Sequence, residues 1–109
     1  MLESKMRYQI FGTTINYLLD NKILEVPDYI KIDVDGIEHL ILEGGDKYLK
    51  NKKIKSLSIE INENFKEQYD EVLKIMRENN FKILHKKNNI KTHENDNKHL
   101  NIFNYVFIR

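Results

Sequence analysis

Four carboxylates of this 109-residue sequence lie around one short turn and the apolar segment that follows it. Asp33 and Asp35 come directly after the apolar run 29–32, Glu38 follows three residues later, and Glu60 lies near the end of the next apolar alternation. Paired carboxylates can take a proton from a substrate, hold a hydroxyl nucleophile or bind a hard divalent cation. Open parallel sheets bind ligands outside the carboxyl ends of their strands, so carboxylates at such ends are candidates for this chemistry.

The acidic turn also has a structural interpretation. Asp35-Gly36-Ile37-Glu38 matches a capping box, in which Asp35 accepts from the first-turn amides and Glu38 reaches back to the cap amide. Capping is therefore favoured for both residues. Asp33 cannot cap this helix because it lies two residues earlier within a strand, where an unpaired buried carboxylate is costly. A functional role and a partnered structural role both stay open for Asp33.

Glu60 strengthens the functional interpretation of Asp33. It lies near the carboxyl end of the predicted strand over 54–62, and neighbouring strands lie about 4.8 Å apart, so the two carboxylates can share one rim. Such proximity can raise the pKa of one member and prepare it for proton abstraction. The alternative is that Glu60 pairs with a lysine. Asp33 and Glu60 are the predicted catalytic residues.

Hydrophobic spacing predicts the elements that position these residues. The expected elements are helices over 14–21, about 36–43 and 65–79, strands over 29–34, 54–62, 81–85 and 102–108, and a polar loop over 86–99. Gly44 and Asn80 are expected in the left-handed conformation that often ends helices, and Asp46 is expected to cap a further helical turn. The helix over 36–43 is expected to bury Ile37, Leu40 and Ile41.

The order of these elements predicts an α/β fold. Three parallel strands joined by right-handed helical crossovers are followed by a last strand, which should return antiparallel because no helix precedes it. A doubly wound sheet normally continues beyond its first strand, so this arrangement corresponds to half of one. We expect a single partial domain over 1–109, with 1–28 as a lead-in helix and linker and 29–109 as the strand-containing unit.

Composition narrows the possible functions. Lys and Arg total 18 against 17 Asp and Glu, and the formal charge of +1 gives no electrostatic reason to expect nucleic acid or an anionic membrane as partner. The absence of cysteine excludes disulfides and thiolate chemistry and favours a reducing cytoplasm. No apolar run has the length of a membrane span or signal peptide. We therefore expect a soluble cytoplasmic protein.

Histidines and lysines offer weaker candidates. The four histidines, His39, His85, His93 and His99, show no metal-ligand spacing, so no histidine metal site is predicted. The lysine-rich run over 47–55 is interpreted as a solvated connection between a helix and a strand, with a nucleic-acid role ranked well below.

Several segments of the chain occur together in one known family. They are Pro27-Asp28-Tyr29-Ile30-Lys31-Ile32-Asp33-Val34-Asp35-Gly36-Ile37-Glu38, Leu42-Glu43-Gly44-Gly45, Ile59-Glu60 and Asn80-Phe81. The combination resembles the FkbM-type methyltransferases over about residues 13–107. The resemblance implies a Rossmann-like enzyme that transfers a methyl group from S-adenosylmethionine, typically to a hydroxyl of a sugar or natural product. Asp33 would then lie beside the methyl-transfer site, with Glu60 on the neighbouring strand.

The family's cofactor site begins with a glycine-rich turn, which has no counterpart in this sequence. The four glycines, Gly12, Gly36, Gly44 and Gly45, lie outside any G-x-G-x-x-G context. The chain is therefore expected to be the carboxyl-terminal half of the domain, truncated or split, with its cofactor-binding residues unknown and without activity in isolation. The expected partners are a small-molecule or glycan acceptor and either an N-terminal half or a second copy of the chain.

Two other interpretations stay open. Asp33-Val34-Asp35-Gly36 also resembles the first motif of magnesium-dependent haloacid-dehalogenase-like phosphatases, although Ile37 replaces the threonine expected after the glycine. The chain could instead be a non-catalytic remnant or an interaction module whose first strand leaves an open edge.

Overall fold

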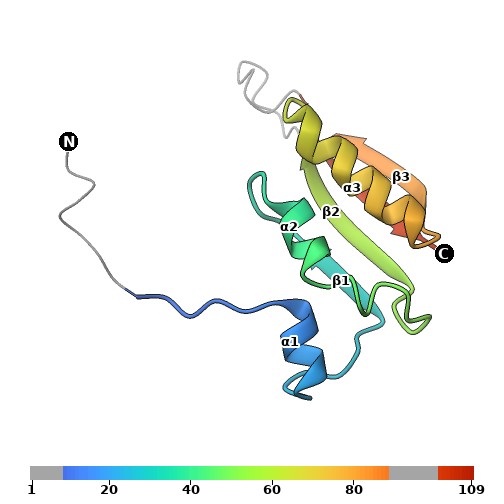
Figure 1. Ribbon diagram of the computed structural model, residues 1–109. Helices are drawn as coiled ribbons and strands as arrows, with labels where there is room; N and C mark the ends of the chain where they lie inside the picture. Colours follow the sequence, from blue (N-terminus) through green and yellow to red (C-terminus); the bar gives the residue numbers. More distant parts are fainter. Residues whose placement is uncertain (1–8, 89–100) are drawn as a thin grey trace.

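The computed structural model describes residues 9–88 and 101–109. Its elements follow the predicted order (Figure 1): α1 Ile15–Asp20, β1 Tyr29–Ile32, α2 Glu38–Glu43, β2 Ser56–Asn62, α3 Lys66–Glu78, β3 Lys82–Asn88 and β4 Ile102–Ile108. β1 is shorter than predicted, and β3 extends past His85 into the predicted loop, whose remainder lies outside the described residues. Within the described ranges, no helix combines the length and apolar character needed to cross a membrane.

The four strands form one mixed sheet in the order β1-β2-β4-β3. β1 and β2 are parallel, whereas β4 lies antiparallel between β2 and β3. The last strand is thus antiparallel as predicted, but the prediction of parallel pairs throughout the first three strands is wrong, because β3 pairs antiparallel with β4 and not with β2. Burial explains the order: β4 contributes Tyr105 and Phe107 to the core, while every residue of β3 is exposed. The more apolar strand takes the central position.

Helices α2 and α3 cover the same face of the sheet and contact each other (Figure 1). The strands alternate accordingly, with the side chains of Leu57, Ile59 and Ile61 buried on β2 and the intervening residues only partly buried. β4 places Tyr105 opposite Ile59, so its buried aromatic residues join the same core. The core therefore lies between the sheet and these two helices.

Helix α2 buries a different set of residues from the one predicted. Glu38 and Leu42 are its buried residues, whereas Ile37 and Leu40 are 49% and 52% exposed and Ile41 is half-buried. The helix begins at Glu38, later than predicted, so its inward stripe runs through positions four residues apart starting there. The prediction that Ile37 and Leu40 are buried is wrong.

The Gly44–Gly45 pair serves helix packing. Gly44 has φ −69°, so the predicted left-handed conformation is wrong there, whereas Asn80 does adopt it with φ 67°. A Cβ on Gly45 would lie 3.0 Å from the Ile15 side chain, and one on Gly44 would lie 3.3 Å from that of Thr14. The absence of side chains at both positions lets α1 approach the end of α2.

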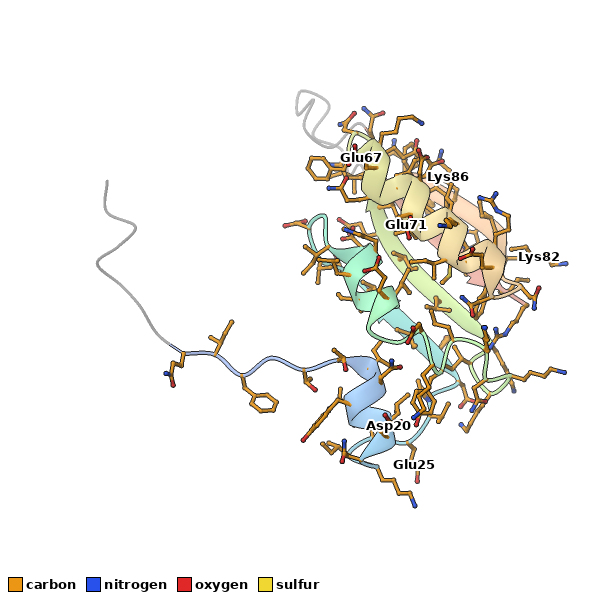
Figure 2. The ribbon with its side chains drawn as sticks, in the orientation of Figure 1. Asp20, Glu25, Glu67, Glu71, Lys82 and Lys86 are labelled. Carbon is orange, nitrogen blue, oxygen red and sulfur yellow. The ribbon has the colours of Figure 1, made fainter. Side chains whose placement is uncertain are left out.

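Polar contacts fix α1 in this position. The Asn16 amide donates to the Gly44 carbonyl at 2.8 Å, and its side chain donates to the Asp46 carboxylate at 2.8 Å. Asp20, at the end of α1, accepts from Lys47 Nζ at 2.6 Å and from the Tyr48 hydroxyl at 2.7 Å (Figure 2). Because the Asp46 side chain accepts from Asn16, it links α1 to the segment after α2 and does not make the predicted helix cap.

Candidate active site

Asp33 and Glu60 are neighbours at one end of the parallel strand pair. β1 and β2 pair with Ile32 opposite Ile59, and each carboxylate residue is the next one along its strand direction. The carboxyl groups of Asp33 and Glu60 are within hydrogen-bonding contact of each other. The structure thus brings together the two residues selected from the sequence.

The surroundings of Glu60 are acidic. Burial is the largest effect and raises its pKa, and the hydrogen bond and negative charge of Asp33 raise it further, followed by the charges of Asp35 and Glu38. The three side chains that raise the pKa of Glu60 in this way are therefore all carboxyls. Two carboxyls in such contact hold a shared proton more readily than two isolated ones, because ionisation of both places like charges side by side.

The acidic turn does not form the predicted capping box. The N-cap of α2 is Ile37, without a side-chain hydrogen bond, and Asp35 is exposed. Gly36 adopts φ 88°, which turns the chain before the helix begins and leaves Asp35 too early to reach the first-turn amides. Glu38 does reach back, but its carboxylate accepts from the amide of Gly36 at 3.1 Å.

Glu38 is the buried carboxyl of this turn, with only 3% of its surface exposed. Burial raises its pKa, and the hydrogen bond from Gly36 opposes this effect. The ring of Phe65 lies 3.4 Å from the position that a Cβ on Gly36 would take, so the turn is packed as well as conformationally restricted. Glu38 therefore stabilises the turn that carries Asp35. Its role in the structure is structural, as the sequence predicted, although the bond it makes differs from the predicted one.

A cavity of about 160 Å³ opens beside the carboxyl groups of Asp35, Glu38 and Glu60. Its lining combines acidic, amide and apolar groups, namely Val34, Asp35, Gly36, Glu38, Glu60, Asn62, Phe65 and Ile102. Sequence reasoning missed Asn62, Phe65 and Ile102 as site residues. Asn62 could have been found, because it is two residues beyond Glu60 and thus on the same side of β2. Phe65 and Ile102 come from other elements and carried no local signal.

The described residues contain no cluster of side chains suited to binding a metal ion. Among them, no group of three or more histidine, aspartate or glutamate side chains is arranged to hold a metal ion. His39 and His85 belong to no such group, and the other two histidines lie outside the described residues. The carboxyl pair of Asp33 and Glu60 is a candidate for proton transfer because the two groups are in contact and the pKa of Glu60 is raised.

An α/β fold with paired carboxylates at the ends of parallel strands is an arrangement found in enzymes of the doubly wound class. The model of the family described as methyltransferase FkbM domain matches residues 9–83, which is more than half of the chain. The chain therefore belongs to the FkbM methyltransferase family. The match contains Asp33 and Glu60 and ends within β3, before β4. No curated protein and no solved structure gave a match.

Proposed function

We propose that this chain supplies the proton-accepting carboxylates of an S-adenosylmethionine-dependent O-methyltransferase. The observation that carries the proposal is the contact between Asp33 and Glu60 at the ends of β1 and β2. Membership of the FkbM methyltransferase family supports the reaction class. The acceptor in this proposal is a hydroxyl group of a sugar or natural product.

The carboxyl pair has a defined task in this proposal. One member, ionised, accepts the proton of the acceptor hydroxyl, and the other holds that hydroxyl or shares the proton. Asn62 and the carboxyls of the cavity can bind further hydroxyl groups, while the Phe65 ring offers an apolar surface for the acceptor scaffold. S-adenosylmethionine, when bound, supplies the methyl group.

The cavity beside the carboxylates is small for S-adenosylmethionine. The cavity of about 160 Å³ beside the carboxylates is smaller than the roughly 300–1,000 Å³ of typical ligand pockets. The Gly44–Gly45 pair, where close approach of a cofactor could be imagined, is filled by the side chains of Thr14 and Ile15. We therefore assign no cofactor-binding residue, and the proposal places that part of the enzyme outside the described residues.

Calorimetric titration tests whether the cofactor site lies outside this chain. S-adenosylmethionine should show no tight binding to the 109-residue chain, and tight binding would contradict the claim that the cofactor site lies elsewhere. Activity is then assayed with methyl-labelled S-adenosylmethionine and a panel of hydroxyl acceptors, using the protein produced with any sequence encoded in frame before Met1. Methyl incorporation that depends on Asp33 and Glu60 is the expected result, and its absence would contradict the proposal.

A non-catalytic interaction module is the second candidate function. The observation in its favour is the outer edge of β1, which has no strand partner among the described residues. An exposed edge favours pairing with another strand. Methyl incorporation lost in Asp33→Asn would exclude this candidate as the sole function, whereas an inactive protein that assembles with another chain would favour it.

A further inference from the structure

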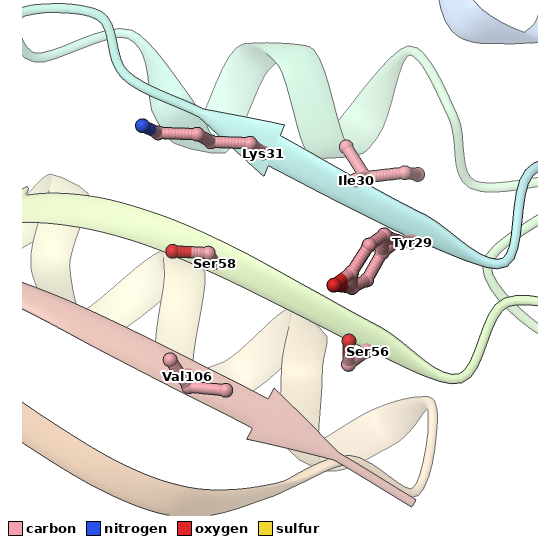
Figure 3. A pocket seen from close by; sticks show the side chains of 6 residues that line it. All are labelled: Tyr29, Ile30, Lys31, Ser56, Ser58 and Val106. Atoms are coloured by element: carbon pink, nitrogen blue, oxygen red, sulfur yellow. The ribbon is translucent and has the colours of Figure 1, made fainter.

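Asn62 ends β2 on the same side of the strand as Glu60. Figure 3 shows Ser56 and Ser58 on this side of β2, and Glu60 and Asn62 continue the series at intervals of two residues. These four residues are partly buried, whereas the residues between them are buried in the core. Glu60 and Asn62 both line the cavity beside the carboxylates. A ligand in this cavity therefore meets a carboxyl and an amide whose Cα atoms are about 7 Å apart along the strand.

The orientation of the Asn62 side-chain amide is fixed by the turn that follows it. Its Oδ1 accepts a hydrogen bond from the Asn64 backbone amide at 2.9 Å, and its backbone carbonyl accepts from the Phe65 amide at 3.1 Å. Only the oxygen of a carboxamide can accept from an N–H group, so this contact decides which end of the amide faces the turn. The other end, the Nδ2 group, accordingly offers two N–H donors to a ligand in the cavity that Asn62 lines.

Hydrogen bonds to the start of β4 hold this turn in place. The Glu63 amide donates to the Asn101 carbonyl at 2.8 Å, and the Asn101 side-chain amide donates to Asn64 Oδ1 at 2.9 Å. Asn62 itself pairs with Ile102 of β4 in the sheet. These contacts limit the positions that the Asn62 amide can take before a ligand binds, and a group ordered in advance loses less entropy on binding.

Asn62 differs in kind from the other polar side chains of the cavity. Those that line it within the described residues are Asp35, Glu38, Glu60 and Asn62, and only Asn62 carries N–H donors. The amide of Gly36, another lining residue, donates to Glu38 at 3.1 Å. A ligand that uses all of these groups offers a hydroxyl to the carboxyls and an acceptor atom to Asn62. The carboxyls would repel a negatively charged acceptor, so a neutral oxygen fits best.

We propose that Asn62 determines the acceptor specificity of this site, by donating from Nδ2 to an oxygen on the carbon atom next to the reacting hydroxyl. The preferred acceptor is then a vicinal diol, the arrangement that sugars carry. This inference rests on the proposed function for the reacting hydroxyl, whose proton passes to the carboxyl pair. The second oxygen is only held, so Asn62 takes no part in the chemical step. A simple alcohol would leave the Nδ2 group without its acceptor, and sites built to bind a polar group discriminate against ligands that lack it.

Nuclear magnetic resonance titration of the isotope-labelled 109-residue chain tests this binding without methyl transfer. The matched probes are cyclohexanol and a cyclohexane with cis hydroxyl groups on adjacent carbons, which differ by one oxygen. The diol should shift the side-chain NH₂ signals of Asn62 and bind about fivefold more tightly than cyclohexanol, the usual value of one hydrogen bond between neutral groups. Equal affinities, no binding of the diol, or diol binding that leaves the Asn62 signals unchanged would each overturn the inference.

Substitution of Asn62 separates its donor from its role in the turn. Asn62→Asp keeps the oxygen that accepts from Asn64 but replaces the NH₂ group with a second oxygen, so the preference for the diol should disappear. Asn62→Ser removes the NH₂ group without adding charge, keeps a weaker acceptor for the Asn64 amide and should give the same loss. Asn64→Asp is the matched control, because it makes the same chemical change on a residue outside the cavity lining and should keep the preference. Circular dichroism confirms that each variant is folded, and either Asn62 variant suffices if the other does not fold. A diol preference that persists in a folded Asn62 variant would overturn the inference.

Kinetics of methyl transfer distinguish failure of this inference from failure of the proposed function. In the protein assayed for methyl incorporation, Asn62→Ser should raise KM for the diol about fivefold with little change in kcat, because a contact outside the chemical step contributes to binding alone. Both constants for cyclohexanol should stay unchanged. An equal loss for the two acceptors would show a purely structural role and overturn the inference. Absence of methyl incorporation in the wild-type protein would contradict the proposed function, and the titration with the diol would still decide whether Asn62 binds the second oxygen.

Discussion

Glu60 and Glu63 are three residues apart, yet they lie in opposite electrostatic surroundings. Glu60 contacts Asp33, and burial followed by the neighbouring carboxyls raises its pKa. Glu63, just after β2, is paired with Lys86 Nζ at 2.6 Å and accepts a hydrogen bond from the Tyr105 hydroxyl. Burial alone would raise the pKa of Glu63, but these two hydrogen bonds lower it overall. One carboxyl is thus held against like charges and the other is neutralised by a partner.

The surroundings of Glu63 form a stabilising cluster. Lys86 of β3 (Figure 2) lies over the Phe103 ring, with its Nζ 4.1 Å from the ring centroid, while it pairs with Glu63. Tyr105 is buried, with its hydroxyl shared between Glu63 and, at 3.3 Å, the Tyr69 hydroxyl. Burial, followed by the hydrogen bond to Glu63, raises the pKa of Tyr105 far above its usual value, so it stays a donor. Each polar atom of this cluster has a complementary partner.

The difference follows from the alternation of a strand. Glu60 alternates with the buried residues Ile59 and Ile61 of β2, so it lies on the uncovered side of the sheet. Glu63 lies in the turn after β2 and reaches the helix-covered side, where it contacts the buried Tyr105. Like-charged carboxyls with raised pKa values cost stability and are more common at functional sites than elsewhere. The end of β2 therefore combines a stabilising carboxyl with a candidate catalytic one.

The largest expected effect concerns catalysis on the Glu60 side. Asp33→Asn or Glu60→Gln should lower methyl transfer by about 100-fold or more, the usual contribution of a positioned proton acceptor. Glu63→Gln, assayed at a temperature where it is folded, should retain most of the activity because it lies on the other side of the strand. Glu43→Gln, on the exposed surface of α2, is the second control. Equal losses in the Glu60 and Glu63 variants would remove the functional distinction between the two regions.

The next effect concerns stability on the Glu63 side. Glu63→Ala leaves the buried Tyr105 hydroxyl with only the long contact to Tyr69 and leaves Lys86 without its carboxylate. The free energy of unfolding should fall by about 2 kcal/mol, the cost of an under-satisfied buried polar group. Chemical denaturation measures this change. A loss no larger than that of an exposed charge substitution would show that the cluster does not stabilise the fold.

The contrast between these regions also shows what the sequence could predict. The alternation in each strand predicted that Asp33 and Glu60 would meet, because the ends of parallel neighbours share one rim. The same alternation reports that 81–85 and 102–108 are strands but not which strand each one pairs with, so the central position of β4 was missed. The conformation of Gly36 was not visible either, and it decides that Asp35 is no helix cap. Phe65 and Ile102 reach the cavity only through tertiary packing.

Glu60→Gln is expected to have a smaller effect on the free energy of unfolding than Glu63→Ala, and of opposite sign, because it should stabilise the protein. A carboxyl with a raised pKa in the folded state binds its proton more tightly than in the unfolded state, so the free energy of unfolding falls as pH rises above 4.5, the ordinary pKa of a glutamate. The substitution removes this penalty and should stabilise the protein at neutral pH by less than about 1 kcal/mol, because solvent screens a partly exposed group. The gain should vanish below pH 4.5, where Glu60 is protonated in both states. Denaturation midpoints measured across this range would contradict the acidic environment if the gain persisted in acid.

The smallest effect on stability is expected for an exposed ion pair. Its comparison with the Lys86–Glu63 pair separates the contribution of burial from that of charge proximity. Lys66 and Asp70 form an ion pair at 3.4 Å on α3, with 80% and 56% of their side chains exposed, whereas the Lys86 and Glu63 side chains are 39% and 22% exposed. Asp70→Asn should change the free energy of unfolding by less than about 0.5 kcal/mol, because exposed pairs are screened and lose side-chain entropy on pairing. Denaturation of Asp70→Asn and Glu63→Ala under the same conditions gives the comparison. If the two losses were equal, the stability assigned to the Glu63 cluster would come from charge pairing alone, and the buried Tyr105 hydroxyl would contribute nothing further.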